Sequence, residues 1–269
     1  MKTSEYKKIA AEARRKVLEM IYNAQTSHIA SNFSCLDILT VLFEKMDSTK
    51  DKFIASKGWI AASVYYFLAR KGIIPKKDLQ RYCQPGEKEY IGLIEPHGKF
   101  GLEFAGGSMG YGLPAGAGFA LAKKLNKGEG KIYILMSDGE MQVGTTWEAA
   151  MIASHHKLDN LLAIIDYNRF QAMGETNKIL NIEPLKNKWE TFGWRVREID
   201  GHNFKEIEKS FTSPPPKKGK PTVIIAHTVK GSGGGTACNL FEDKIEWHYR
   251  YVDEKTYKLA LALLSKEKM

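Results

Sequence analysis

Four short runs of apolar and β-branched residues constrain the fold of this chain most strongly. They cover residues 131–137 (KIYILMS), 161–166 (LLAIID), 194–199 and 222–227 (TVIIAH). Runs of this length without polar alternation are typical of strands buried on both faces of a parallel sheet. Apolar residues at helical spacing occupy 5–23, 35–45, 58–70, 113–125, 145–156, the stretch after His202, and 255–264. We therefore expect an α/β fold, a doubly wound parallel sheet with helices on both faces. One domain over residues 1–269 with an N-terminal helical extension accounts for the pattern.

Composition excludes several classes of protein. Hydrophobic residues make up 43% of the 269 residues and charged residues 26%, as in an ordinary globular domain rather than a disordered or fibrous chain. No run approaches the roughly 18 to 20 apolar residues of a membrane span. The charged N-terminus does not resemble a signal peptide, so we expect no membrane association and a cytoplasmic location. The three cysteines lack CxxC spacing, so neither a disulfide framework nor a zinc site is expected.

The charge balance is basic, with 40 Lys and Arg residues against 31 Asp and Glu and a net charge of +9. The lysines are spread along the chain instead of being gathered on one helix face. Basic residues do not alternate with aromatic ones in the manner of a nucleic-acid surface. We therefore expect no nucleic-acid partner and favour a phosphorylated or otherwise anionic small molecule as substrate.

Polar residues follow two of the predicted strands directly. Asp138 and Gly139 come after the strand at 131–137, and Asn168 follows the strand at 161–166. Residues 140–167 have the length of one helix and one strand, which places Asp138 and Asn168 at the same sheet edge, where α/β proteins bind ligands. Carboxylate, amide and carbonyl oxygens suit Mg²⁺, with diphosphate oxygens and water completing the shell. The alternative is an ordinary Asp-Gly turn and an unrelated loop asparagine.

A glycine-rich segment, residues 105–114 (AGGSMGYGLP), opens the predicted helix at 113–125. Glycines allow a backbone to approach a ligand closely, and a helix N-terminus favours anions. The spacing is not GxGxxG after a strand, so a dinucleotide fingerprint is not indicated. A tight turn with close packing is the alternative.

Two other features have ordinary interpretations. His202 is expected to be a turn residue, whereas His227 ends a predicted strand near the glycines of 231–235, and a place for it in the site is left open. Residues 213–221 (SPPPKKGKP) are expected to form an exposed loop before a strand.

Taken together, these residues resemble a known family. Asp-Gly followed at this distance by Asn resembles the thiamine diphosphate motif, usually written GDG and then Asn. More narrowly, the chain resembles the N-terminal, diphosphate-binding half of a split transketolase. The segments that carry the resemblance are 24–28 (AQTSH), 53–58 (FIASKG), 101–110 (GLEFAGGSMG), 147–151 (WEAAM), 157–160 (KLDN) and 228–231 (TVKG), followed by Trp247 and His248.

The resemblance implies the thiamine diphosphate-binding fold, with thiamine diphosphate and Mg²⁺ as cofactors. Asp138, the side chain of Asn168 and the carbonyl of Phe170 would hold Mg²⁺ against the diphosphate, and Gly139 would bring its amide to a phosphate. Gly107, Ser108 and Met109 would lie along the cofactor. The catalytic histidines would be His28, facing the reacting carbonyl, and His248, reaching the diphosphate region. His97 is a third candidate, from its position in the sequence and not from the family motif.

The chain departs from the family at three positions near the site, and two of them, the lost histidines, bear on the substrate. Trp59 and Leu93 stand where the family has histidines, and Tyr249 replaces a glycine after His248. His97 lies close enough in sequence to be a partial replacement for the histidine lost at Leu93. The usual pentose phosphate specificity is therefore in question, whereas the residues for the diphosphate are retained.

The resemblance also implies an activity and a partner. A two-carbon unit would pass from a ketose-type donor to an aldehyde acceptor, with the pyrimidine half of the site on a second, C-terminal transketolase-like subunit. A chain of 269 residues leaves no room for that half, so we expect the active site at an interface, in a heterotetramer. Two alternatives are an α-type subunit of another thiamine diphosphate enzyme with a 2-oxo acid donor, and a non-catalytic binding subunit.

Overall fold

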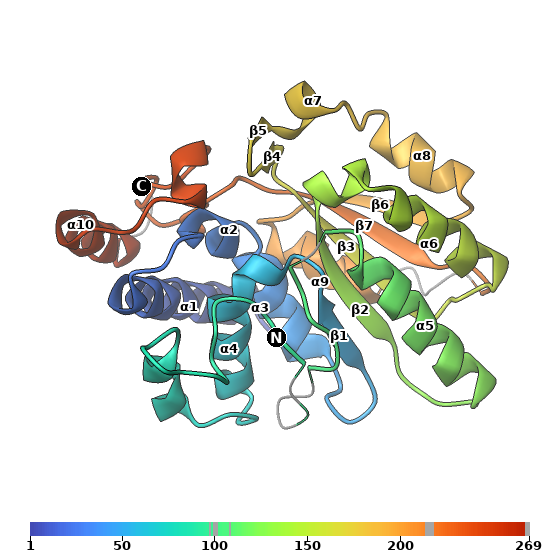
Figure 1. Ribbon diagram of the computed structural model, residues 1–269, viewed down its shortest axis with the longest axis horizontal. Helices are drawn as coiled ribbons and strands as arrows, with labels where there is room; N and C mark the ends of the chain where they lie inside the picture. The colour runs from blue at the N-terminus through green and yellow to red at the C-terminus, as the bar shows by residue number, and fades with distance from the viewer. Residues whose placement is uncertain (97, 99–101, 108, 213–217, 267–269) are drawn as a thin grey trace.

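A twisted parallel sheet forms the centre of the molecule (Figure 1). The computed structural model describes residues 1–96, 98, 102–107, 109–212 and 218–266. Within them the sheet has five strands in the order β1-β2-β3-β7-β6, all parallel. The strands are β1 (Lys52–Ala55), β2 (Ile132–Ser137), β3 (Leu161–Tyr167), β6 (Arg195–Asp200) and β7 (Thr222–His227), and β4 (Phe170–Gln171) and β5 (Gly174–Glu175) form a separate antiparallel hairpin.

Helices cover both faces of the sheet, because successive strand residues point to opposite sides. Along β3, Leu162 and Ile164 pack with one group of helices, and Leu161, Ala163 and Ile165 with the other. The first group is α1 (Thr3–Ala24), α3 (Leu36–Lys45), α4 (Ala61–Arg70) and α9 (Phe204–Thr212); the second is α5 (Gly112–Leu125), α6 (Gly144–His155) and α8 (Leu185–Thr191). The α10 helix (Glu254–Leu264) packs beside α1 (Figure 1). The predicted fold class is confirmed.

The register of the strands brings their carboxyl ends together. Ser137 of β2 is paired with Asp166 of β3, and Asp166 with Ala226 of β7. The segments that follow these strands therefore begin at one edge of the sheet, and Asp138 and Asn168 follow neighbouring strands, as predicted. Five short helices of the described part carry candidate site residues or adjoin them: α2 (Ile29–Ser34), η1 (Gly58–Ile60), η4 (Asp138–Gln142), α7 (Thr176–Ile179) and η5 (Ile245–His248). The short helix η2 (Lys76–Arg81) carries none of them.

The predicted elements agree with the structure to within a few residues, but several short elements were omitted. The sequence did not predict β1, α2, the β4–β5 hairpin, α7, α8 or the short η helices, each of which has seven residues or fewer. The helix expected from residue 58 begins at Ala61, because η1 precedes it. The first part of the predicted proline-rich loop, 213–217, lies outside the described residues. None of the described helices is long and apolar enough to span a membrane.

Candidate functional site

A cavity of about 530 Å³ lies at the carboxyl edge of the sheet. Its volume is within the range of small-molecule and cofactor sites. Segments far apart in the sequence contribute to it: the residues before and in α2, η1, the glycine-rich segment, the ends of β2 and β3, the loop after β7, and η5. Of the predicted site residues, the lining includes His28, Gly107, Met109, Asn168, Phe170 and His248.

Asp138 begins η4 directly after β2 and is fully buried. Its Oδ2 accepts hydrogen bonds from the backbone amide of Arg169 (2.7 Å) and the hydroxyl of Thr176 (3.1 Å). Burial, reinforced by the nearby carboxylate of Asp166, raises the pKa of Asp138 to about 7. Within the described residues no lysine or arginine forms an ion pair with Asp138. A bound cation would strongly stabilise the ionised form of a carboxylate that is buried without a paired cation.

Asn168 lies beside Asp138, because the backbone amide that donates a hydrogen bond to Asp138 belongs to the residue after Asn168, Arg169. The Nδ2 of Asn168 donates to the hydroxyl of Ser34 (3.0 Å) and to Asp166 (3.3 Å), which fixes the orientation of the side chain. Its Oδ1 accepts from the backbone amide of Phe170 (2.9 Å). The three predicted metal ligands therefore lie close together: Asp138 follows the end of β2, and Asn168 and Phe170 lie in the turn after the neighbouring strand β3.

The sequence analysis missed a buried ion pair below the cavity. The Lys57 ammonium, on a side chain only 10% exposed, donates to the fully buried carboxylate of Asp166 and to the carbonyl of Ser31 (3.0 Å). Burial alone would raise the pKa of Asp166, but Lys57 outweighs it and holds that pKa below its ordinary value. The position of Asp166 at the carboxyl end of a predicted strand was a signal that could have identified it.

A second lysine was also missed. Lys230, on the loop after β7, is buried and lines the cavity. Its Nζ lies 3.1 Å from Nδ1 of His248. Burial, and then the charge of Lys57, lower the pKa of Lys230 to about 8. Two cationic side chains, Lys57 and Lys230, therefore line the same cavity as Asn168 and Phe170, an arrangement that favours an anionic ligand.

The two predicted catalytic histidines of the described part are close neighbours. The ring centroids of His28 and His248 lie 4.8 Å apart. Burial, and then Lys230, lower the pKa of His28 to about 4 and that of His248 to about 3, so both rings are neutral at pH 7. The backbone of His28 is left-handed (φ +71°), a conformation that a non-glycine residue adopts at a cost and that is frequent at functional sites.

Aromatic side chains surround His28 at the mouth of the cavity. The Trp59 ring stacks on His28 with centroids 4.6 Å apart and planes 9° from parallel, and Tyr249 meets the same imidazole edge-on at 6.1 Å. Both remain substantially exposed, Trp59 at 46% and Tyr249 at 59%. Two of the three residues that depart from the family pattern thus flank one histidine and make this wall of the cavity apolar.

The glycine-rich segment approaches the cavity closely. Gly107 has φ +117°, and a Cβ there would lie 2.3 Å from Cδ1 of Leu93, so only glycine fits. Met109 lies against Gly139, and the amide of Gly139 donates to Oδ1 of Asp138 (2.8 Å), so its contact with a phosphate stays a prediction. Two other predicted residues, His97 and Ser108, lie outside the described residues.

Two histidines outside the cavity differ in their surroundings. His227 is half-exposed, packs edge-on against Tyr167 and lies 3.4 Å from Glu198, away from the cavity lining. His202 is in a turn, as expected, but its ring reaches Asp37, a contact that its place in the sequence did not indicate.

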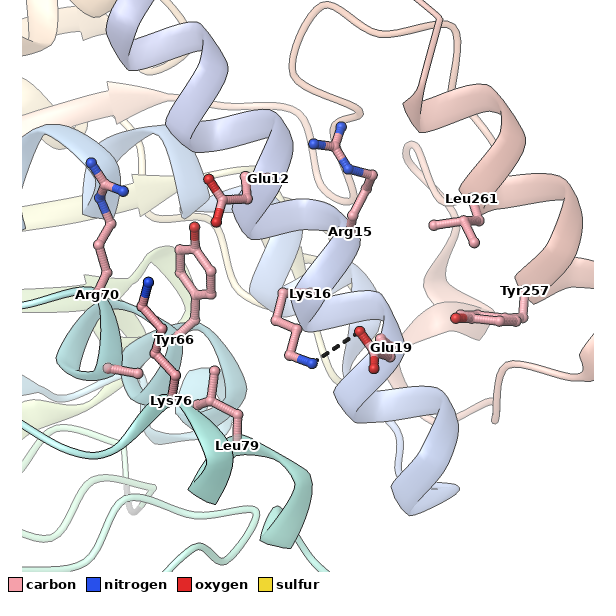
Figure 2. Close-up of a pocket in the computed structure, with 11 residues that line it drawn as sticks. Glu12, Arg15, Lys16, Glu19, Tyr66, Arg70, Lys76, Leu79, Tyr257 and Leu261 are labelled. Carbon is pink, nitrogen blue, oxygen red and sulfur yellow. Dashed lines mark hydrogen bonds and ion pairs between the residues drawn. The ribbon is translucent and has the colours of Figure 1, made fainter. Parts of the chain in front are cut away.

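A second cavity, of about 480 Å³, lies between α1, α4, η2 and α10 (Figure 2). Charged side chains of α1, such as Glu12, face it together with Tyr66 and Leu261, and Lys16 is paired with Glu19 (Figure 2). None of the predicted site residues lines it. The candidate active site is therefore the cavity at the sheet edge.

Comparison with known proteins identifies the family. The family described as "Transketolase, thiamine diphosphate binding domain" matches residues 5–243. The chain belongs to this family. One subunit of the apulose-4-phosphate transketolase of Actinobacillus succinogenes is 36% identical, covering 98% of this chain and 97% of the relative. The 6-deoxy-6-sulfo-D-fructose transketolase subunit of a Clostridium species is 33% identical, covering 94% of each.

Solved structures agree with the sequence relatives. The transketolase of Campylobacter jejuni superimposes with a TM-score of 0.88 at 28% identity, covering 99% of this chain. This chain spans only 44% of that transketolase. The predictions of a transketolase-type transferase and of the thiamine diphosphate-binding fold are thereby confirmed. The predicted resemblance to the N-terminal half of a split transketolase is confirmed by the family match and by the relatives of matching length that are named as transketolase subunits.

Proposed function

We propose that this chain is the diphosphate-binding subunit of a two-chain transketolase. With Mg²⁺ and a partner subunit, it transfers a two-carbon unit from a ketose-type donor, phosphorylated or otherwise anionic, to an aldehyde acceptor. The observation that carries the proposal is the buried carboxylate of Asp138, without a paired cation in the described residues, next to Asn168 and below a cavity lined by Lys57 and Lys230. When bound, thiamine diphosphate supplies the electron sink for breaking and forming carbon–carbon bonds.

The residues present fit a Mg²⁺-diphosphate group. Asp138, Asn168 and the carbonyl of Phe170 are hard oxygen donors, and Mg²⁺ is usually bound by one or two carboxylates plus phosphate oxygens and water. Among the described residues, no group of three or more His, Cys, Asp or Glu could hold a metal alone. Such a set of protein donors is incomplete by itself and agrees with a Mg²⁺ site in which phosphate oxygens of the ligand supply further coordination.

The chain's own groups have definable roles at this cavity. Lys230, and Lys57 to the extent that Asp166 leaves its charge available, neutralise the diphosphate. His28 and His248 are neutral at pH 7. Nδ1 of His28 meets the hydroxyl of Ser27 (2.6 Å) and Nδ1 of His248 meets the ammonium of Lys230 (3.1 Å), which leaves Nε2 of each ring for a substrate hydroxyl or carbonyl. Gly107 lets the backbone come close to the cofactor.

The surface near the cavity supports a partner subunit. Three large apolar side chains that line the cavity are exposed, Trp59, Met109 and Tyr249, and exposed apolar groups that lie together are typical of interaction surfaces. Tyr111 and Met173, within two residues of lining residues along the chain, are exposed as well. Two relatives of matching length are named as subunits of apulose-4-phosphate transketolases, and the chain matches less than half of a whole transketolase. A partner that carries the pyrimidine half, in a heterotetramer, accounts for these observations.

The test is reconstitution. Titration calorimetry should show thiamine diphosphate binding in the presence of Mg²⁺ when the chain is co-purified with a pyrimidine-half subunit from the same organism. Two-carbon transfer should require both chains, because half of the cofactor site is on the partner. Transfer by this chain alone at the rate of the complex would contradict the two-chain arrangement.

A second candidate donor follows from the apolar wall. Trp59 and Tyr249 flank His28, and Leu93 packs behind Gly107 instead of offering a hydrogen bond. A hydroxyl buried against such a wall without a partner costs about 1–3 kcal/mol. A donor fragment that carries a methyl group, as in a 2-oxo acid such as pyruvate, avoids this cost.

Donor preference can be measured directly on the reconstituted enzyme. A 2-oxo acid donor predicts that pyruvate is used better than xylulose 5-phosphate, and that Trp59→His raises kcat/KM for the ketose phosphate by about 10-fold, the equivalent of one recovered hydrogen bond. Tyr251→His, an exposed aromatic outside the cavity lining, is the matched control and should change nothing. Efficient use of xylulose 5-phosphate by the unchanged enzyme would reject the 2-oxo acid donor.

A further inference from the structure

We propose that Arg14, Asp37 and His202, which do not line the cavity, form a positioning network that holds Lys230 in place for an anionic ligand. The proposal rests on the proposed function, since it takes the diphosphate as the group that Lys230 meets. These residues belong to α1, α3 and the turn after β6.

The centre of the network is a buried ion pair. Arg14 and Asp37 are completely or almost completely buried, and the guanidinium meets the carboxylate through two parallel contacts, of 2.7 and 3.0 Å. Burial alone would raise the pKa of Asp37, but Arg14 and then His202 outweigh it and hold the pKa well below its usual range. A bidentate pair of this kind fixes both side chains in one geometry.

His202 connects this pair to the loop. The backbone amide of Val229 donates to Nε2 of His202 (2.9 Å), so that nitrogen carries no hydrogen. The hydrogen is therefore on Nδ1, which donates to Oδ2 of Asp37 (2.8 Å). Asp37 thus selects the tautomer in which the imidazole is able to hold Val229.

The network holds the loop on both sides of Lys230. His202 accepts from Val229, the residue before Lys230, and Nε of Arg14 donates to the carbonyl of Ser232, two residues after it (2.9 Å). Gly234 has φ +65°, and a Cβ there would lie 2.2 Å from the Arg14 guanidinium, so the loop lies directly against that group. These contacts fix the backbone on either side of Lys230. They thereby position its buried side chain, whose Nζ lies 3.1 Å from Nδ1 of His248.

Substitution at His202 separates positioning from general stability. His202→Phe keeps a ring of similar size but loses both hydrogen bonds, whereas His202→Gln keeps one donor and one acceptor. His156→Phe, on an exposed histidine at the end of α6, is the matched control. Each variant chain is titrated with inorganic diphosphate in the presence of Mg²⁺, and each reconstituted enzyme is titrated with thiamine diphosphate.

For His202→Phe we expect roughly 10-fold weaker diphosphate binding, the size of effect seen when a supporting hydrogen bond is lost. The half-saturating thiamine diphosphate concentration should rise by a similar factor while kcat at saturation stays the same. His202→Gln should recover most of the affinity, and His156→Phe should match the unchanged chain.

Unchanged diphosphate binding by His202→Phe would overturn the network's role. So would equal losses in the Phe and Gln variants, or a fall in kcat at saturation with unchanged half-saturation, since these indicate a structural role only. Lys230→Ala tests the proposed function separately: if it binds diphosphate as the unchanged chain does, Lys230 is not the group that meets the anion. That result would overturn the assignment of Lys230 together with this inference.

Discussion

Replacement of Asp138 by alanine should abolish cofactor-dependent activity of the reconstituted enzyme. The carboxylate is the single charged protein ligand in the proposed Mg²⁺ set, and a cation that bridges to a diphosphate depends on it. Because even indirect support of a metal site is worth 10- to 100-fold in affinity, the loss of this ligand should cost more than about 100-fold. Asn168→Ala, which removes a neutral ligand, should weaken binding less, by roughly 10-fold.

The measurement is titration calorimetry with Mg²⁺ and thiamine diphosphate on the two-chain complex, beside the activity assay. Asp47→Ala, at an exposed aspartate between α3 and β1, is the control and should leave both unchanged. The pKa of Asp138, raised to about 7 by burial and by Asp166, adds a dependence on pH. Since Mg²⁺ requires the ionised form, its affinity should fall as the pH decreases below 7. Wild-type cofactor affinity in Asp138→Ala would reject the site.

The parts of the fold that could be predicted are those with local signals. The strand at 161–166 is a nearly continuous apolar run that ends at Asp166. The residues that follow it, and those that follow the strand at 131–137, lie at one edge of the sheet in the structure, as predicted. By contrast, β1 has four residues, and it is a strand because it pairs with β2 about 80 positions later, a relation that no local pattern records. The β4–β5 hairpin pairs only two residues on each side.

The same distinction applies to the site. Asp138 and Asn168 were predictable because their positions at strand ends determine where they lie. The partners of Lys57 and His202 were not, since Lys57 meets a carboxylate 109 positions away and His202 meets one 165 positions away. Side chains that act through such contacts have no characteristic spacing. His202 was correctly expected in a turn, but its interactions became evident only in the structure.

Asp166→Ala is expected to lower the free energy of unfolding of the cofactor-free chain by about 3–5 kcal/mol, the range found when one partner of a buried ion pair is removed. The substitution leaves the Lys57 ammonium, 10% exposed, without its carboxylate, and it removes the acceptor of Ser34 and Asn168 as well. Urea unfolding followed by circular dichroism measures the change. Glu254→Ala, which breaks the exposed Glu254–Lys258 pair, should have no measurable effect.

The double variant Lys57→Met with Asp166→Leu decides whether the loss at Asp166 comes from the unpaired charge. Removal of both charges leaves neither one buried alone, so the double variant should lose less stability than the two single variants, Lys57→Met and Asp166→Leu, lose in sum. Some loss will remain, since the hydroxyls of Ser34 and Thr228 no longer have the Asp166 acceptor. If the two single losses simply add, Lys57 and Asp166 do not interact in the folded chain. The contact between the residues after β1 and the end of β3 would then depend on the backbone pairing and not on this ion pair.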